Sequence, residues 1–145
     1  MKIALNSIMV DDQSKALAFY TDKLGFELRE DVTVPEMGNF RWLTVGPVGQ
    51  PDVAIVLMEI PGPPVFDEDT SAKVKELMAK GAAGGLFFET ANCQATYEDL
   101  KAKGVQFERY DMPGMKHEGD VHVAGSMRAA WFKDPDGNIL SIVSG

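Results

Sequence analysis

The sequence has a single cysteine, Cys93, in 145 residues. One thiol cannot form a disulfide within the chain, and it cannot supply the cysteine pairs of a CxxC zinc site. This composition fits a reducing compartment, so we expect a cytoplasmic protein. The N-terminal stretch agrees, because Asp11 and Asp12 interrupt its apolar residues too early for a signal peptide.

Basic side chains are also scarce. The chain has 14 Lys and Arg residues against 22 Asp and Glu residues, which gives a formal net charge of -8. A nucleic-acid-binding protein needs a basic surface to replace phosphate counterions, and anionic membranes need one as well. No apolar run approaches the roughly 18 residues of a membrane-spanning helix. We therefore expect neither nucleic acid nor a membrane as a partner.

What the chain does have is enough apolar residues, 45% of the total, to bury a core. A chain of this length forms one domain, or two small half-domains that share a core. Hydrophobic periodicity predicts the following elements. Strands are expected at residues 3–10, from 26, at 39–45, 53–60 and 84–90, from 105, and at 127–134 and 138–144; helices are expected at 13–26, 71–81 and 91–104; and a loop is expected at 113–126.

These elements contain a repeat: a strand, a helix and three strands occur twice, at an offset of about 80 residues. We therefore predict an α+β fold within a single domain, residues 1–145, in which two βαβββ units form curved mixed sheets around a cavity, with the helices outside. The units would be residues 1–60 and 83–145. Residues 61–82 would link them and contain a short helix.

Three stretches carry a family resemblance: VDDQSKALAFYTDKLGF, FETANCQATYEDLKAKGVQF and AAWFKDPDGNILSIVS. Together they resemble the vicinal oxygen chelate superfamily, which includes glyoxalase I, extradiol dioxygenases and bleomycin resistance proteins. The resemblance covers nearly the whole chain, and it implies the paired βαβββ fold. It also implies a homodimer, because single two-unit chains of this family often pair.

The metal enzymes of this family hold a divalent ion with His and Glu side chains from four strands. The resemblance places those four positions at Leu5, near Ala54, at about Gly85 and at Ser141. Such an ion needs several imidazole or carboxylate ligands, and these residues offer at most one weak hydroxyl. We therefore expect no metal at the family site and no cofactor.

A different metal site is conceivable in KHEGDVH, which brings His117, Glu118, Asp120 and His122 together in sequence. The simpler interpretation is a solvated loop, or a lid with one histidine entering the cavity, because ordering a loop costs entropy. Either histidine could also serve as an acid or base near neutral pH.

Two further reactive side chains have a functional and a structural interpretation. Alternation places Glu89 on the face that should line the cavity, where a buried carboxylate would be a catalytic candidate. The structural interpretation is a solvated carboxylate at the exposed end of its strand. Cys93 lies at a helix N-terminus, but we expect a packed or surface thiol.

Aromatic residues suggest a binding pocket. Trp131 alternates with Phe132 along a strand, so Trp131 should face the cavity when Phe132 faces the core. Aromatic walls with a few polar groups suit a flat organic ligand, although ordinary core packing would explain the same residues. The candidate lining residues are Ser7, Trp42, Met58, Phe87, Trp131 and Ser141.

Two functions remain open on the sequence alone. The first is a metal-free member of the superfamily that binds a small organic molecule, aromatic or drug-like, in the cavity between the sheets. The second is a lyase, isomerase or oxygenase of glyoxalase or dioxygenase type. That enzyme would use a displaced metal held by His117, His122 and Glu89, or metal-free acid–base chemistry at His122 or Glu89.

Overall fold

The computed structural model describes residues 1–145. The chain divides into two compact units, Met1–Lys80 and Gly81–Gly145. The division falls inside the segment 61–82 that we expect to link the two repeats. Each unit has its own sheet, and no helix reaches the length and apolarity that a membrane crossing requires.

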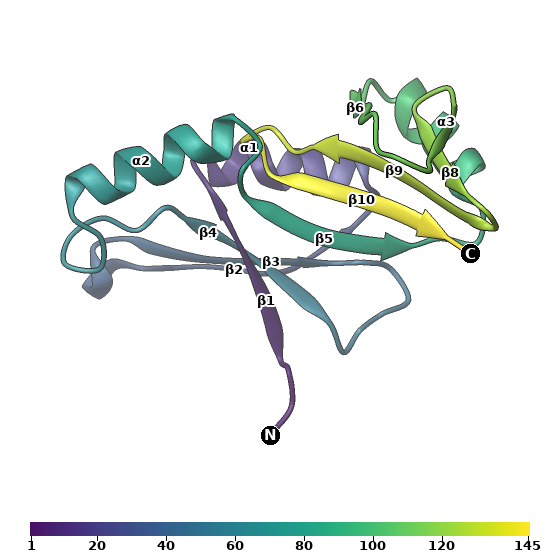
Figure 1. Cartoon of the computed structure of the whole chain (residues 1–145). Helices are drawn as coiled ribbons and strands as arrows, with labels where there is room; N and C mark the ends of the chain where they lie inside the picture. Colours follow the sequence, from purple (N-terminus) through teal and green to yellow (C-terminus); the bar gives the residue numbers. More distant parts are fainter. The chain divides into compact units, whose positions relative to one another are not determined.

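Unit 1 is built on a four-stranded sheet in the order β1-β4-β3-β2 (Figure 1). The first strand, β1, pairs in parallel with β4, and the other neighbours are antiparallel. Its elements, in chain order, are β1 (Leu5–Val10), α1 (Gln13–Ala18), the π-helical turn η1 (Phe19–Lys23), β2 (Glu27–Val34), the 3-10 turn η2 (Pro35–Met37), β3 (Phe40–Gly46), β4 (Ala54–Glu59) and α2 (Glu68–Ala79).

Helix α1 is fixed at its N-terminus. Asp12 caps it by accepting a hydrogen bond from the Lys15 backbone N–H at 2.9 Å. The side chain of Gln13 donates to the carbonyl oxygens of Arg41 and Leu57, at 3.0 and 2.9 Å. One glutamine therefore ties the helix to both central strands, β3 and β4, of this sheet.

Helix α2 begins three residues earlier than the expected 71–81. Asp67 caps it by accepting from the Thr70 backbone N–H at 2.7 Å. A hydrogen bond from the Thr70 side chain, together with this backbone one, lowers the pKa of the Asp67 carboxyl. Met78 is buried, but Leu77 is 52% exposed. The expected apolar face of this helix is therefore only partly covered.

Unit 2 repeats the pairing of unit 1, because its first strand, β5, is parallel to its last, β10. Its sheet has the order β5-β10-β9-β8-β7, and β6 pairs with β9; Figure 1 shows β5, β9 and β10 side by side. The expected α+β class with two mixed sheets is confirmed. Its elements are β5 (Gly84–Glu89), α3 (Cys93–Ala102), β6 (Phe107–Glu108), β7 (Lys116–Glu118), β8 (Val121–Ala124), β9 (Met127–Lys133) and β10 (Ile139–Ser144).

The expected loop at 113–126 is wrong, because β7 and β8 form a hairpin there in which His117 pairs with His122. Gly119 and Asp120 make the two-residue turn, and Gly119 has a φ of 66°, which glycine adopts without strain. The β-branched valines of this segment favour a strand and its glycine favours a tight turn, but its many polar residues made it resemble a loop.

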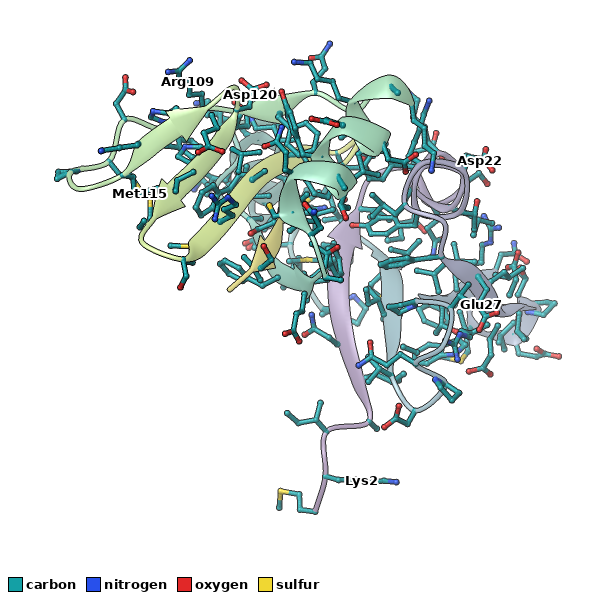
Figure 2. The ribbon with its side chains drawn as sticks, turned by 90° about the vertical axis from the view of Figure 1, so that its right-hand side faces the viewer. Lys2, Asp22, Glu27, Arg109, Met115 and Asp120 are labelled. Carbon is teal, nitrogen blue, oxygen red and sulfur yellow. The ribbon has the colours of Figure 1, made fainter.

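The tip of this hairpin is held by helix α3. The Tyr97 hydroxyl donates to an Asp120 carboxylate oxygen at 2.8 Å, and the Lys101 amine donates to the Tyr97 oxygen at 2.8 Å. Asp120 is labelled in Figure 2 at the end of the hairpin. This contact positions His122, which lies two residues beyond Asp120.

The turn between β9 and β10 is organised by one buried carboxylate. One oxygen of Asp134 accepts from the backbone N–H groups of Asp136 and Asn138, at 3.0 and 2.9 Å. The other oxygen accepts from the Asn138 side-chain amide at 2.9 Å. Gly137 completes the turn with a φ of 93°. The DPDGN motif thus has a structural role, which fixes the register of β10 against β9.

We predict that Asp134→Ala lowers the free energy of unfolding by about 3 kcal/mol, because it leaves buried donors without their charged acceptor. Urea unfolding monitored by circular dichroism measures this change. Pro135→Ala is the matched control: its side chain is exposed in the same turn, and its effect should stay at or below about 1 kcal/mol. Equal effects of the two substitutions would contradict the proposed role of Asp134.

Candidate functional site

The strand register assigns the residues of the unit 1 sheet to two faces. One face, which includes Ile8, Val10 and Leu57, is buried, and β4 contacts α1. We call the opposite face, which α1 does not cover, the open face of unit 1; Thr44 and Val56 on it are nevertheless buried. Its residues are Leu5, Ser7 and Met9 on β1, Ala54, Val56 and Met58 on β4, Phe40, Trp42 and Thr44 on β3, and Glu30, Val32 and Val34 on β2.

Three of the candidate lining residues, Ser7, Trp42 and Met58, fall on this open face. Ser7 is in register with Val56, and Met58 with Met9. The Trp42 indole nitrogen donates to a Glu30 carboxylate oxygen at 3.4 Å. Register therefore brings the three to one side of a single sheet, from three different strands.

One end of the open face of unit 1 is hollowed into a pocket of about 720 Å³. It lies where β3 begins and β4 ends, and Met37, Phe40, Met58 and Val65 contribute to its lining. Of the candidate lining residues only Met58 takes part. No sequence pattern pointed to Met37 or Val65, because both lie outside the strands. Met37 is in the turn η2, and Val65 is in a proline-rich connection whose path has no periodic pattern.

Unit 2 has the same two-sided arrangement. Phe107 and Phe132 are in ring contact, and Tyr97 of α3 contacts Phe107, which identifies the face covered by the helix. We call the opposite face the open face of unit 2. Its residues are Phe87 and Glu89 on β5, Ser141 and Val143 on β10, Met127, Ala129 and Trp131 on β9, Glu108 on β6, His122 and Ala124 on β8, and His117 on β7.

The other three candidate lining residues form one row across this face. Ser141 is in register with Phe87 on one side and with Trp131 on the other. Phe87 is 62% exposed, whereas Ser141 is only 1% exposed. An exposed phenyl ring, a buried hydroxyl and an indole ring thus lie next to one another.

Beside that row lies an aromatic cluster of four rings: Tyr110, His117, His122 and Trp131. The His122 ring centre is 4.8 Å from that of Trp131, edge to face, and 4.5 Å from that of His117. Tyr110 contacts Trp131 at 5.9 Å between ring centres. Burial raises the pKa of the Tyr110 phenol, and the nearby Glu108 charge raises it further. The sequence analysis missed Tyr110, which follows a strand that is shorter than expected.

The two histidines hold the backbone of Tyr110. Its N–H donates to Nε2 of His122 at 2.9 Å, and its carbonyl oxygen lies 3.0 Å from Nε2 of His117. A backbone N–H can only donate, so Nε2 of His122 accepts and the neutral ring carries its proton on Nδ1. His122 is fully buried. The expectation of histidines in a solvated loop is therefore wrong, because the hairpin carries His122 into the packed sheet.

The positions that the family would use for metal do not fit an ion. Leu5 and Ala54 are in register on adjacent strands, and neither side chain has a donor atom. Gly85 lies in β5 where the register with β10 shifts. Within each unit no group of three or more His, Cys, Asp or Glu side chains could hold a metal. The Nε2 atoms of His117 and His122 contact the backbone of Tyr110, so these two nitrogens are already occupied by contacts within the chain.

The candidate catalytic residues differ in exposure and in the hydrogen bonds that they make. Glu89 is exposed at the end of β5, which agrees with the structural interpretation of that residue. His122 uses Nε2 to hold Tyr110. Cys93 is buried, its sulfur lies 3.7 Å from the Ile142 carbonyl oxygen, and burial raises the pKa of its thiol.

Comparison with known proteins adds a family and several relatives. The family model described as "Glyoxalase/Bleomycin resistance protein/Dioxygenase superfamily" matches residues 2–142. The uncharacterised protein YurT of Bacillus subtilis (strain 168) is 36% identical over 143 residues, which covers 99% of this chain and 98% of YurT.

Two solved structures are similar over their whole length. The crystal structure of UcmS2 has a TM-score of 0.81 and 39% identity, covering 100% of this chain and 98% of that one. The structure of TnmS3, described as an antibiotic binding protein from Streptomyces sp. CB03234, has a TM-score of 0.64 and 28% identity, covering 98% and 93%.

We predict that the protein, purified without a His tag or added metal, contains less than about 0.1 metal ion per chain, because the family positions lack donor atoms. Elemental analysis measures this content. Soaking in Zn²⁺, Ni²⁺, Mn²⁺ or Fe²⁺ should leave the melting temperature unchanged. One tightly held ion per chain would contradict the prediction and would direct attention to His117 and His122.

Proposed function

Because the chain belongs to the glyoxalase/bleomycin resistance protein/dioxygenase superfamily, we propose that it binds a small aromatic molecule and does not transform it. The observation that carries the proposal is the row of Phe87, Ser141 and Trp131 beside the aromatic cluster on the open face of unit 2. The ligand packs its rings against Phe87 and Trp131.

Physical chemistry supports an aromatic ligand. A phenyl ring that is 62% exposed on a sheet face is an apolar surface that gains by being covered. Trp131 presents a large, rigid surface and meets His122 edge to face, which is a favourable aromatic geometry. A flat molecule that covers both Phe87 and Trp131 buries a large apolar area. It immobilises only two side chains, each with few rotamers, so the entropy cost of binding is small.

The arrangement of polar groups supports binding over catalysis. A metal-free acid–base reaction needs a base within reach of the substrate. Nε2 of His122 holds the Tyr110 backbone, and Glu89 lies at the exposed end of its strand. The description of the relative TnmS3 as an antibiotic binding protein also supports a ligand of natural-product size for this chain.

We also propose a binding surface within unit 1, for which Ser7, Trp42 and Met58 are the lining residues. The pocket of about 720 Å³ next to Met58 is within the size range of small-molecule sites. Methionine and phenylalanine side chains give such a pocket an adaptable apolar wall. Homodimerisation also belongs to this proposal, and light scattering of the purified chain tests it.

The experiment is a binding screen of neutral two- and three-ring aromatic compounds, including naphthalene and quinoline, followed by tryptophan fluorescence. We expect saturable binding, which Trp131→Ala weakens by about tenfold or more, as for a central aromatic anchor. Phe87→Ala should also weaken it.

The control is Leu77→Ala, which removes an exposed apolar side chain from α2, a helix that contributes no residue to the proposed site. It should leave binding unchanged. Binding of the same strength in wild type, Trp131→Ala and Phe87→Ala would refute the proposed site, and a lack of saturable binding to any compound would refute the proposed function.

A further inference from the structure

Two polar atoms on the open face of unit 2 are buried and make no hydrogen bond: Nδ1 of His122 and Oγ of Ser141. Both residues are at most 1% exposed. Buried polar groups in folded proteins almost always have a partner, so two without one on the same face require an explanation. They also flank Trp131, the residue that the proposed function depends on.

The unpartnered atom of His122 is a hydrogen-bond donor. Its Nε2 accepts from the Tyr110 N–H, so the proton of the neutral ring lies on Nδ1. The carbonyl oxygen of Tyr110 lies 3.0 Å from Nε2 of His117 and 3.1 Å from the same Nε2 atom of His122. The backbone hydrogen of Tyr110 points at Nε2 of His122, and a second hydrogen on that nitrogen would clash with it, so His122 does not donate to the carbonyl. The His117–Tyr110–His122 arrangement therefore fixes one tautomer, and it leaves an N–H group with no acceptor.

No residue around this N–H accepts a hydrogen bond from it. His122 is in register with Ala129, whose methyl group is apolar. Its ring contacts are the rings of Tyr110, His117 and Trp131. A hydrogen-bond acceptor on a ligand removes the free-energy cost of leaving this donor buried and unpaired. It therefore contributes more to the binding free energy here than it would at a donor exposed to water.

Ser141 supplies the second polar point. It lies on β10, whereas His122 lies on β8, and Trp131 on the intervening strand β9 is in register with Ser141. Two strand spacings separate the backbones of β8 and β10 by about 10 Å. The polar points thus lie on either side of the Trp131 indole, at a separation that a two- or three-ring molecule can span.

The charges nearby select a neutral acceptor. Glu108 is in register with Trp131, and Glu89 with Val143 beside Ser141. Lys133 forms an ion pair with Glu108 at 3.4 Å, which compensates the negative charge of only one of these two carboxylates. A ligand carboxylate would face the remaining negative charge, and a chain with a net charge of -8 repels anions in general.

We propose that the ligand is a neutral, flat aromatic molecule with a hydrogen-bond acceptor at its edge, a ring nitrogen or carbonyl oxygen, which accepts from Nδ1–H of His122. The Ser141 hydroxyl bonds a second polar group at the opposite edge. This inference rests on the proposed function and specifies the chemistry of the same site.

The test compares naphthalene with quinoline, which have the same shape and differ by one ring nitrogen. Wild type should bind quinoline about tenfold tighter than naphthalene. His122→Phe, which keeps an aromatic ring but removes the donor, should abolish that preference while naphthalene binding is kept. Ser141→Ala should weaken ligands that carry a second polar group, such as hydroxyquinoline, and leave naphthalene unaffected.

Ser144→Ala is the matched control for Ser141→Ala. It removes a hydroxyl from the same strand, but one that accepts from the Cys93 backbone N–H at 3.4 Å, and it should leave every affinity unchanged. Because His122→Phe also removes the acceptor for Tyr110, imidazole NMR of the wild-type protein gives an independent measurement. The His122 ring should be protonated on Nδ1, and that signal should shift on addition of quinoline and not of naphthalene.

The outcomes separate the two proposals. Equal affinities for naphthalene and quinoline, with an unmoved Nδ1 signal, would overturn the inference. The proposed function would survive that result if Trp131→Ala still weakened both compounds. Saturable binding by none of the aromatic compounds would instead remove the proposed function, and the inference with it.

Discussion

In each unit the first strand is hydrogen-bonded in parallel to the last, β1 to β4 and β5 to β10, and the site geometry depends on this pairing. Parallel neighbours cannot be joined by a hairpin, so the intervening chain must cross over and return. The crossover places α1 and α3 against one face of their sheets and leaves the opposite face uncovered by them. The turn organised by Asp134 then fixes which residues of β9 and β10 share that open face.

Much of this could be predicted from the sequence. Alternation along β9 predicted that Trp131 lies on the face opposite Phe132, because a strand has a period of two. The family resemblance indicated Ser141. The repeat predicted two mixed sheets, and the strands expected at 127–134 and 138–144 left only a short connection between them. These inferences rest on local rules that hold wherever neighbouring strands fix the register.

The remainder depends on contacts between distant residues. Nothing in KHEGDVH shows that Tyr110 offers its backbone to two histidines, because a strand that contains charged residues and a loop look alike in composition. The pocket beside Met58 is formed partly by a proline-rich connection with no periodicity. The absence of metal ligands could be inferred from residue types, whereas the unpaired donor on His122 required the hydrogen bonds themselves.

Gly85 also limits how the protein can be changed. Its φ is 115°, a conformation that glycine adopts freely and that residues with a β-carbon avoid. A histidine placed there would strain the backbone, and neighbouring Gly84 is still more restricted, because a β-carbon would lie 2.5 Å from the backbone N and O of Ile139. Point substitutions at the four family positions therefore cannot simply rebuild a metal centre. The start of β5 would have to be remodelled first, so main-chain geometry opposes a metal centre at these positions as much as the missing ligands do.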